Sequence, residues 1–241
     1  EEKRKYDDFG VLIRANSQSR AIEEAFLQNN IPYTMSGGTS FFERKEIKDI
    51  ISYLRIISNH DDDINLLRII NTPRRGIGRS TIEAINKVAN TMSISLWESI
   101  KAIISCPPEE CPVNDKTKAD LESFVNIIEN CKNMLSGKGL SKKVKTLVDD
   151  IDYFGYLISD NPKSEKAARF KYMNIESLIK SMEQWENNPE HEDTSLYAYL
   201  NRITLLSRDD LEDSENDKGK VNLMTIHASK GLEFPVVFIA G

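Results

Sequence analysis

The last stretch of the chain, residues 221–241, reads VNLMTIHASKGLEFPVVFIAG. Two apolar, β-branched segments, VNLMTIHA and PVVFIAG, flank the polar segment KGLEF, a pattern typical of two buried strands joined by a turn. The other strands of such a sheet have to come from elsewhere in the chain.

The start of the chain supplies further strands. Residues 9–16, FGVLIRAN, begin apolar and turn polar, which predicts a buried strand that runs into a loop. Residues 17–30, SQSRAIEEAFLQNN, have the spacing of a helix, and residues 31–38, IPYTMSGG, are short, extended and end in two glycines. Strand, helix and strand in this order indicate the beginning of an α/β unit.

The sequence between these two ends is predominantly helical. Aspartates at 61–63 predict the start of one helix that Pro73 ends, and Ser80 is expected to cap the next. Helical periodicity then continues to Leu206, and residues 207–220 form a polar, acidic linker. An earlier helix carries its apolar residues on one face, at Ile47, Ile50, Ile51, Leu54 and Ile57. We therefore expect an α/β domain, split in sequence, with a mainly α-helical domain inserted into it.

Composition limits the class of protein. The length of 241 residues suits one large domain or two smaller ones, and the net charge of −6 argues against a bulk electrostatic nucleic-acid binder. A locally basic DNA site remains compatible with that charge. No apolar run approaches the ~20 residues of a membrane span. Three cysteines, an odd number, favour reduced thiols and a cytoplasmic setting, and no metal site is expected.

Polar side chains follow the strand that begins at residue 221. Thr225 and His227 are expected at its carboxyl end, where ligand sites gather in open α/β sheets. Lys230 adds a cation, Gly231 permits close backbone approach, and the carboxylate of Glu233 can accept hydrogen bonds from a ribose. For each residue alone, a charged turn between two buried strands is the simpler interpretation, but the complete string is more specific.

A second candidate site is the segment TPRRGIGRST, residues 72–81. Gly76, Ile77 and Gly78 predict a tight turn with one apolar anchor, followed by a helix whose N-terminal N–H groups can bind a phosphate. Such binding would ignore base identity and depend on salt. The alternative is an ordinary interhelical turn. Positive charge is expected from Arg74, Arg75 and Arg79.

Several segments, in order along the chain, resemble the superfamily 1A helicases of the UvrD/PcrA/Rep group. MTIHASKGLEFPVVFIAG is similar to motif V, VLIRANSQSR to motif IVa, SGGTSFFERKEIKDIISYLR to motif IVb, and NTPRRGIGRST to the duplex-contacting motif IVc. The segments IDYFGYL, KAARFKYMNIESLI and SGGTSFF resemble most closely the Rep branch of that family. The resemblance covers essentially the whole chain.

The resemblance implies a fold and a division into domains. In this family two RecA-like domains, 1A and 2A, hold ATP between them, and a helical domain, 2B, is inserted into 2A. The chain would then be α/β plus mainly α, a partial RecA-like P-loop NTPase domain with its helical insertion. Residues 1–36 and 218–241 would belong to 2A, and residues 37–217 to 2B.

Residue roles follow from the same resemblance. Arg14, Asn16, Thr225 and His227 would bind single-stranded DNA, and Glu233 would hold the ribose of ATP. Simpler interpretations of these residues stay open: a loop salt bridge for Arg14, a turn-forming side chain for Asn16, a strand-end cap for Thr225 and a surface carboxylate for Glu233. Duplex DNA would be bound by Gly76, Ile77, Gly78, Arg79 and Thr81. Two adjacent aromatic residues, Phe41 and Phe42, are expected in the core and outside the DNA site.

The sequence also lacks parts that the family's reaction needs. No GxxxxGK[ST] phosphate loop occurs in it, so no catalytic residue is assigned, and the chain alone is expected not to hydrolyse ATP. ATP and Mg²⁺ would bind to a full-length 3′-to-5′ helicase in which 2B regulates unwinding. Expected partners are single-stranded DNA, a duplex junction, domains 1A and 1B, and replication or repair proteins in the bacterial cytoplasm, associated with the nucleoid. The alternative is a non-enzymatic DNA- or protein-binding module derived from a helicase.

Overall fold

The computed structural model describes residues 4–29, 31–135, 137–208 and 219–240. Its strands are β1 (Phe9–Ile13), β2 (Tyr33–Ser36), β3 (Val221–Thr225) and β4 (Val236–Ala240). Its α-helices are α1 (Ser19–Gln28), α2 (Lys45–Ser58), α3 (Asp63–Ile69), α4 (Arg79–Met92), α5 (Leu96–Ser105), α6 (Asp115–Met134), α7 (Leu140–Asp150), α8 (Tyr153–Asp160), α9 (Glu165–Glu186) and α10 (Leu196–Arg208). Short 3₁₀ turns cover Tyr6–Asp8, Asn16–Gln18 and Phe41–Glu43.

The strands form one parallel sheet in the order β2-β3-β1-β4. Strand β1 lies between β3 and β4, so the start of the chain pairs on both sides with its end. Gly10 is opposite Asn222 on one side and Val237 on the other. The mixed α/β class is therefore confirmed. The names 2A and 2B and the boundaries 1–36, 37–217 and 218–241 stay predictions, and most of the expected acidic linker lies outside the described residues.

Strand β4 differs from its prediction as a buried strand. Val237, Phe238 and Ile239 are 46%, 55% and 78% exposed. The apolar run does form a strand, as predicted. However, β4 lies at the edge of the sheet, and among the described residues it pairs only with β1. Burial of an apolar strand depends on what covers it, and the sequence of the strand does not contain that information.

Helix α2 lies at the centre of the helical part. Its predicted apolar face is confirmed, because Ile47, Ile50, Ile51, Leu54 and Ile57 are all buried. The helix packs against α3, α6, α9 and α10, which explains why it is buried on more than one side. Phe41 and Phe42, just before it, are also in the core as expected, with their rings edge to face at 5.4 Å.

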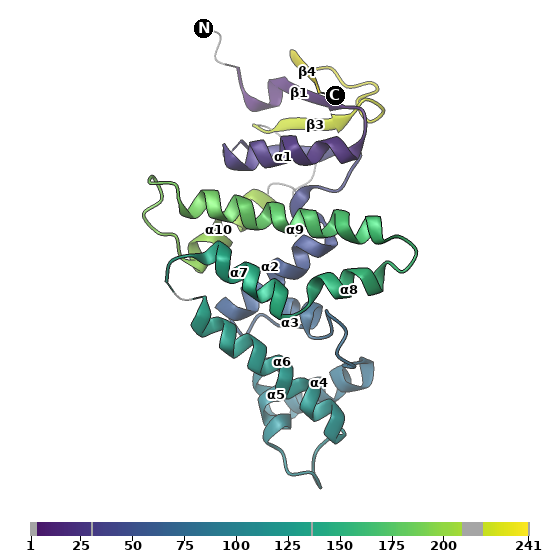
Figure 1. Cartoon of the computed structure of the whole chain (residues 1–241), viewed down its shortest axis with the longest axis vertical. Coiled ribbons are helices and arrows are strands. Elements are labelled where there is room, and N and C mark those ends of the chain that lie inside the picture. The colour runs from purple at the N-terminus through teal and green to yellow at the C-terminus, as the bar shows by residue number, and fades with distance from the viewer. Residues whose placement is uncertain (1–3, 30, 136, 209–218, 241) are drawn as a thin grey trace.

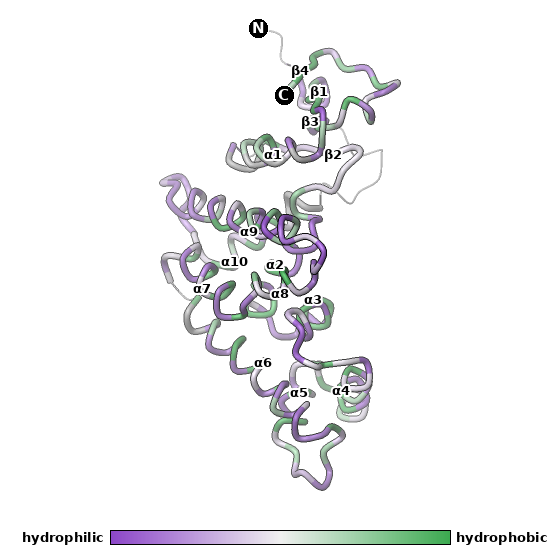
Figure 2. The backbone as a smooth tube through the Cα atoms, turned by 45° about the vertical axis from the view of Figure 1, so that its right-hand side comes forward, coloured by the Kyte–Doolittle hydropathy of each residue, from purple (hydrophilic) through white to green (hydrophobic). Residues whose placement is uncertain are grey.

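The elements are arranged along a long axis. Figure 1 shows the sheet at one end, α1 beneath it, then α9 and α10, with α7 and α8 further down and α4, α5 and α6 at the far end. Figure 2 shows hydrophobic and hydrophilic stretches alternating along most helices, as expected of helices with one buried face. The first strand, β1, and the last, β4, lie side by side in the sheet, while the helices between β2 and β3 extend away from it.

The sequence predicts capping residues for two helices, and the structure confirms one of them. Asp62 caps α3, because its carboxylate accepts a hydrogen bond from the N–H of Asn65 at 3.1 Å. The prediction that Ser80 caps the next helix is wrong. Helix α4 begins at Arg79, so Gly78 occupies the cap position and Ser80 lies inside the first turn.

A histidine is packed in the far part of the helical region. The ring of His60 stacks on Trp97, with ring centroids 4.5 Å apart and planes 9° apart. Its Nε2 lies 3.4 Å from Nζ of Lys132. Burial, together with the positive charge of Lys132, lowers the pKa of His60 below its usual value. His60 therefore favours the neutral state in the folded chain.

Candidate nucleic-acid interface

The carboxyl ends of β1 and β3 bring the predicted single-strand residues together. Ile13 is opposite Thr225 in the parallel register, and the N–H of Ile226 donates to the carbonyl of Ile13 at 2.9 Å. The chain therefore leaves both strands at the same edge of the sheet. Arg14 and His227, the next polar residues on each side, are both exposed there.

The end of β2 joins the same edge. The side-chain amide of Asn16 donates to the carbonyl of Gly37 at 3.2 Å. Gly37 has φ +80°, and a Cβ at this position would lie 2.7 Å from Cβ of Ala228, in the turn after β3. A side chain does not fit, so glycine is what lets the segment after β2 lie against that turn. One surface at this edge of the sheet is thus formed by Arg14, Asn16, Thr225, His227 and the glycine pair at residues 37–38. We call it the strand-end surface.

Hydrogen bonds hold this surface in shape. The Gln18 side chain accepts from the N–H groups of Arg14 and Ala15 at 2.9 and 3.1 Å, which fixes the loop after β1. The Thr225 hydroxyl accepts from the N–H of Ala228 at 3.2 Å. Thr225 therefore does cap the turn, as its simpler interpretation states, yet its O–H can still donate to a phosphate. Guanidinium, amide, hydroxyl and imidazole groups together suit a nucleic-acid backbone.

Glu233 lies apart from these residues. The chain returns from the carboxyl end of β3 to the amino end of β4, where Val236 is opposite Phe9. A Cβ at Gly10 would lie 2.7 Å from the Phe234 ring, so the residue after Glu233 packs near the amino end of β1. A strand of this length spans about 13 Å. Glu233 is exposed and lies on the segment that leads back to the amino end of β4.

The predicted duplex site is a turn between α3 and α4. Gly76 is exposed with φ +76°, Ile77 is 1% exposed and anchors the turn, and Gly78 precedes the first residue of α4. No side chain caps this helix, so its first N–H groups lack an acceptor within the helix. The side chain of Thr81 is buried, which leaves its backbone N–H rather than its hydroxyl as the candidate for phosphate.

The arginines near this turn play different roles. Arg74 and Arg79 have exposed side chains, and Arg79 pairs with Glu83 of the next helical turn at 2.9 Å. Arg75 instead points inward: its guanidinium donates to the carbonyls of Ile69 and Pro73 at 3.2 and 3.1 Å. The positive charge expected from Arg75 is therefore directed into the fold, where its guanidinium holds the turn together.

Aromatic groups complete the Arg75 site. Its guanidinium lies over the Phe124 ring at 5.3 Å and donates to the hydroxyl of Tyr53. Burial raises the pKa of Tyr53 to about 12, so this hydroxyl keeps its proton at neutral pH.

A buried polar network, which the sequence analysis missed, joins the sheet part to the helices. Glu23 in α1 is fully buried and accepts from Ser19, Tyr33, the N–H of Phe41 and the guanidinium of Arg44. Arg44 also donates to Asn174 in α9 at 3.1 Å. In sequence, Glu23 looks like a solvent-facing residue of an amphipathic helix. Helix α1 packs against α9, as Figure 1 shows, and this packing together with the groups that bond to Glu23 buries its side chain.

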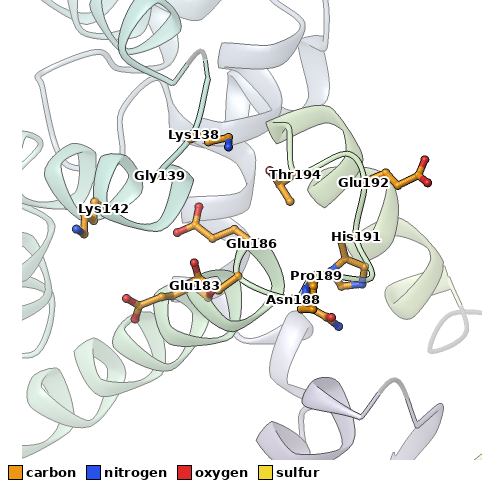
Figure 3. Close-up of a pocket in the computed structure, with 11 residues that line it drawn as sticks. Lys138, Gly139, Lys142, Glu183, Glu186, Asn188, Pro189, His191, Glu192 and Thr194 are labelled. Atoms are coloured by element: carbon orange, nitrogen blue, oxygen red, sulfur yellow. Dashed lines mark hydrogen bonds between the residues drawn. The ribbon is translucent and has the colours of Figure 1, made fainter.

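One cavity of the helical part contains none of the predicted residues. It has a volume of about 520 Å³ and lies between α7, α9 and the loop before α10. Figure 3 shows Glu186 directed toward the start of α7, and His191 and Pro189 on the loop that follows α9. Glu186 accepts hydrogen bonds from the N–H and hydroxyl of Ser141, so it acts as a cap for α7. Cations and carboxylates mix in its lining, and this gives no single ligand preference.

No cluster of three or more His, Cys, Asp or Glu side chains with the geometry of a metal site occurs in the part of the chain that the structure describes. In that same part, no helix has both the length and the apolar character needed to cross a membrane.

Comparisons with known proteins identify the family. The model of the UvrD-like helicase C-terminal domain matches residues 1–241. The chain is 38% identical to the ATP-dependent DNA helicase PcrA of Bacillus subtilis, over 99% of this chain and 32% of that protein. Proteins of the same name from Staphylococcus epidermidis and Staphylococcus aureus are 37% and 36% identical, each over 99% of this chain and 31% of the relative. The chain spans about a third of the length of these curated relatives. It belongs to the UvrD-like helicase C-terminal domain family, in the UvrD/PcrA/Rep group of superfamily 1A helicases.

Proposed function

We propose that a protein carrying this chain is an ATP-dependent DNA helicase, and that the strand-end surface binds single-stranded DNA. The observation that carries the proposal is the convergence of Arg14, Asn16, Thr225 and His227, from opposite ends of the sequence, at one edge of the sheet. Each of these groups can donate a hydrogen bond to a phosphate, a contact that does not read the sequence. The names of the relatives, which describe ATP-dependent DNA helicases, support the same conclusion.

Binding of a labelled oligothymidine, measured by fluorescence anisotropy, tests this surface. Arg14→Ala and His227→Ala are each expected to weaken binding, Arg14→Ala by about tenfold, because a hydrogen bond to a charged group contributes roughly 1.5–3 kcal/mol. Lys101→Ala is the matched control, since it removes one exposed positive charge from α5, far along the molecule. Equal losses from Arg14→Ala and Lys101→Ala would mean that only total charge matters.

The turn that contains Gly76 and Gly78 is proposed to bind duplex DNA through the N-terminal N–H groups of α4, with Arg79 as a phosphate partner. Removing one phosphate contact reduces the slope of log affinity against log salt by about 0.9. Arg79→Ala should therefore lower that slope by about this amount for a duplex and leave single-strand binding unchanged. An unchanged salt slope would remove Arg79 from the site.

The remaining functions concern the longer protein. Glu233 is proposed to contact the ribose of ATP, because its carboxylate is exposed and separated from the strand-end surface. ATP and Mg²⁺ would be held mainly by groups that this sequence lacks, so the chain alone would not hydrolyse ATP. DNA-stimulated hydrolysis by the purified chain, above that of a mock preparation, would contradict this.

The helicase is proposed to be Rep-like, moving 3′-to-5′ on single strands in bacterial replication or repair within the nucleoid. The helices between β2 and β3, as domain 2B, would regulate unwinding. Deleting them from the full-length protein and measuring unwinding against translocation tests this role: a helicase whose unwinding rate does not change upon deletion would refute it.

A further inference from the structure

A cavity of about 440 Å³ adjoins the strand-end surface and is not used by any function described above. It opens between the loop after β1, the start of α2 and the first turns of α9, which Figure 1 shows passing beneath α1. Its volume falls within the range of roughly 300–1,000 Å³ typical of ligand sites. Asn16 lies both on the strand-end surface and in the wall of this cavity, so the two are continuous.

The floor of the cavity is polar and fixed. Asn174 is 2% exposed, accepts from Arg44 at 3.1 Å and donates to Glu46 at 2.6 Å. Arg44 is held in turn by buried Glu23. A floor of amide and guanidinium groups, each already oriented by hydrogen bonds, can meet the polar edge of a ligand without reorganising.

The rim carries an exposed aromatic side chain. Phe170 in α9 is 43% exposed, and none of the described residues stacks on its ring. The nearby Phe154 differs in this respect, since its ring packs edge-on against Tyr172 at 4.9 Å. A phenylalanine that stands half in solvent at the mouth of a polar cavity offers a π-face to a planar ligand.

Among the charged side chains of the lining, Lys171 is the cation that forms no ion pair with a carboxylate in the described residues, whereas Arg44 is paired with Glu23. The charged side chains of the lining are Arg44, Lys45, Lys171 and a single carboxylate, Glu46. Lys171 donates to the neutral amide of Asn161 at 3.0 Å, so this bond leaves its charge uncompensated. Lys45 is partly neutralised by Asp160 at 3.2 Å. Lys171 is therefore the cation best placed to meet a phosphate.

We propose that this cavity takes one unpaired nucleotide of single-stranded DNA, with its base stacked on Phe170 and its phosphate near Lys171. The inference rests on the proposed function and extends it, because the strand would run from Asn16 into the cavity rather than stay on the edge of the sheet. Stacking on a phenylalanine tolerates any base, which suits an enzyme that moves along a strand.

The test compares two oligonucleotides of about eight units in the anisotropy assay with the purified chain. One is oligothymidine, and the other has the same backbone with abasic units. Phe170→Ala should weaken oligothymidine binding about fivefold or more and leave abasic binding unchanged, since only the base can stack. Met173→Ala, an equally exposed residue one turn further along α9 and outside the lining, is the matched control and should change neither.

Each other outcome overturns a defined part of the reasoning. If Arg14→Ala weakens binding but Phe170→Ala does not, the cavity is not part of the path, while the strand-end surface stands. If Phe170→Ala weakens the binding of both oligonucleotides equally, the substitution acts by changing the shape of α9 and not by removing a stacking contact with a base. If the unmodified chain binds neither oligonucleotide, the proposed function and the cavity fall together. Displacement of oligothymidine by free thymidine monophosphate at the same affinity would make the cavity a site for single nucleotides instead.

Discussion

Replacing Arg44 by methionine should destabilise the chain far more than the loss of an exposed ion pair would. The Arg44 guanidinium lies 2.5 Å from a Glu23 oxygen, with 13% of the arginine side chain and none of the glutamate side chain exposed. The substitution keeps most of the apolar stem but leaves the buried carboxylate without its positive partner. Breaking a buried pair from one side costs about 3–5 kcal/mol.

The structure places the expected cost at the lower end of this range. Three donors remain on the Glu23 carboxylate: Ser19 at 2.7 Å, Tyr33 at 2.9 Å and the N–H of Phe41 at 2.7 Å. We therefore expect a loss of about 3 kcal/mol, which for a chain of this size lowers the thermal midpoint by about 6–12 °C. Circular dichroism at neutral pH measures the midpoint, and urea denaturation checks the free energy.

Two further variants decide whether the reasoning holds. Arg79→Met removes one partner of an exposed ion pair, in which the Arg79 side chain is 94% exposed and the Glu83 side chain 64%. It should lower the free energy of unfolding by less than about 0.5 kcal/mol. Adding Glu23→Gln to Arg44→Met should recover part of the loss, because no unpaired charge is then buried. Equal shifts for the Arg44 and Arg79 variants, or a double variant less stable than Arg44→Met, would refute the argument.

Three other outcomes are expected. Because the folded chain lowers the pKa of His60, the unfolded chain takes up this proton first as pH falls. The stability of the wild type relative to His60→Gln should therefore decrease as pH falls through the usual histidine pKa of about 6.5, and a constant difference would contradict this. Ile239→Lys should reduce concentration-dependent association in sedimentation experiments, whereas Ile64→Lys, on an exposed helix position, should have less effect. Gly76→Ala should lower stability by about 1–2 kcal/mol, because φ is +76°, while Gly78→Ala, with an ordinary φ, should be nearly neutral in thermal unfolding.

Sequence reasoning succeeded where the information is local. The periodicity of Ile47, Ile50 and Leu54 reports one helix face directly, and apolar runs at both ends of the chain report strands. The sequence places Thr225 at a strand end, and only the family resemblance groups it with Arg14; the structure then shows that the two strands pair side by side. The DNA and ATP roles of the site residues themselves stay predictions.

Sequence reasoning failed where the answer depends on residues distant in the sequence. Glu23 is polar by every local criterion, and only the approach of Arg44 beneath α1 buries it. Arg75 looks identical to Arg74 in the sequence, yet its guanidinium reaches carbonyls and Phe124 within the fold. Phe170 could have been noticed as an aromatic residue between basic ones, but the cavity beside it comes from three separate segments.

The central place of β1 also has a consequence for synthesis. Ile13 and its partner Thr225 are roughly 200 residues apart in the chain. At typical rates of about 5–20 residues per second, a ribosome needs on the order of 10–40 s to make the second after the first. During that interval β1 has neither of its neighbours, while the contacts of α2 with α3 and α6 are local enough to form. These helices should therefore form on the ribosome before β1 pairs with β3 and β4, and Val11 and Ile13 should stay accessible to chaperones until then.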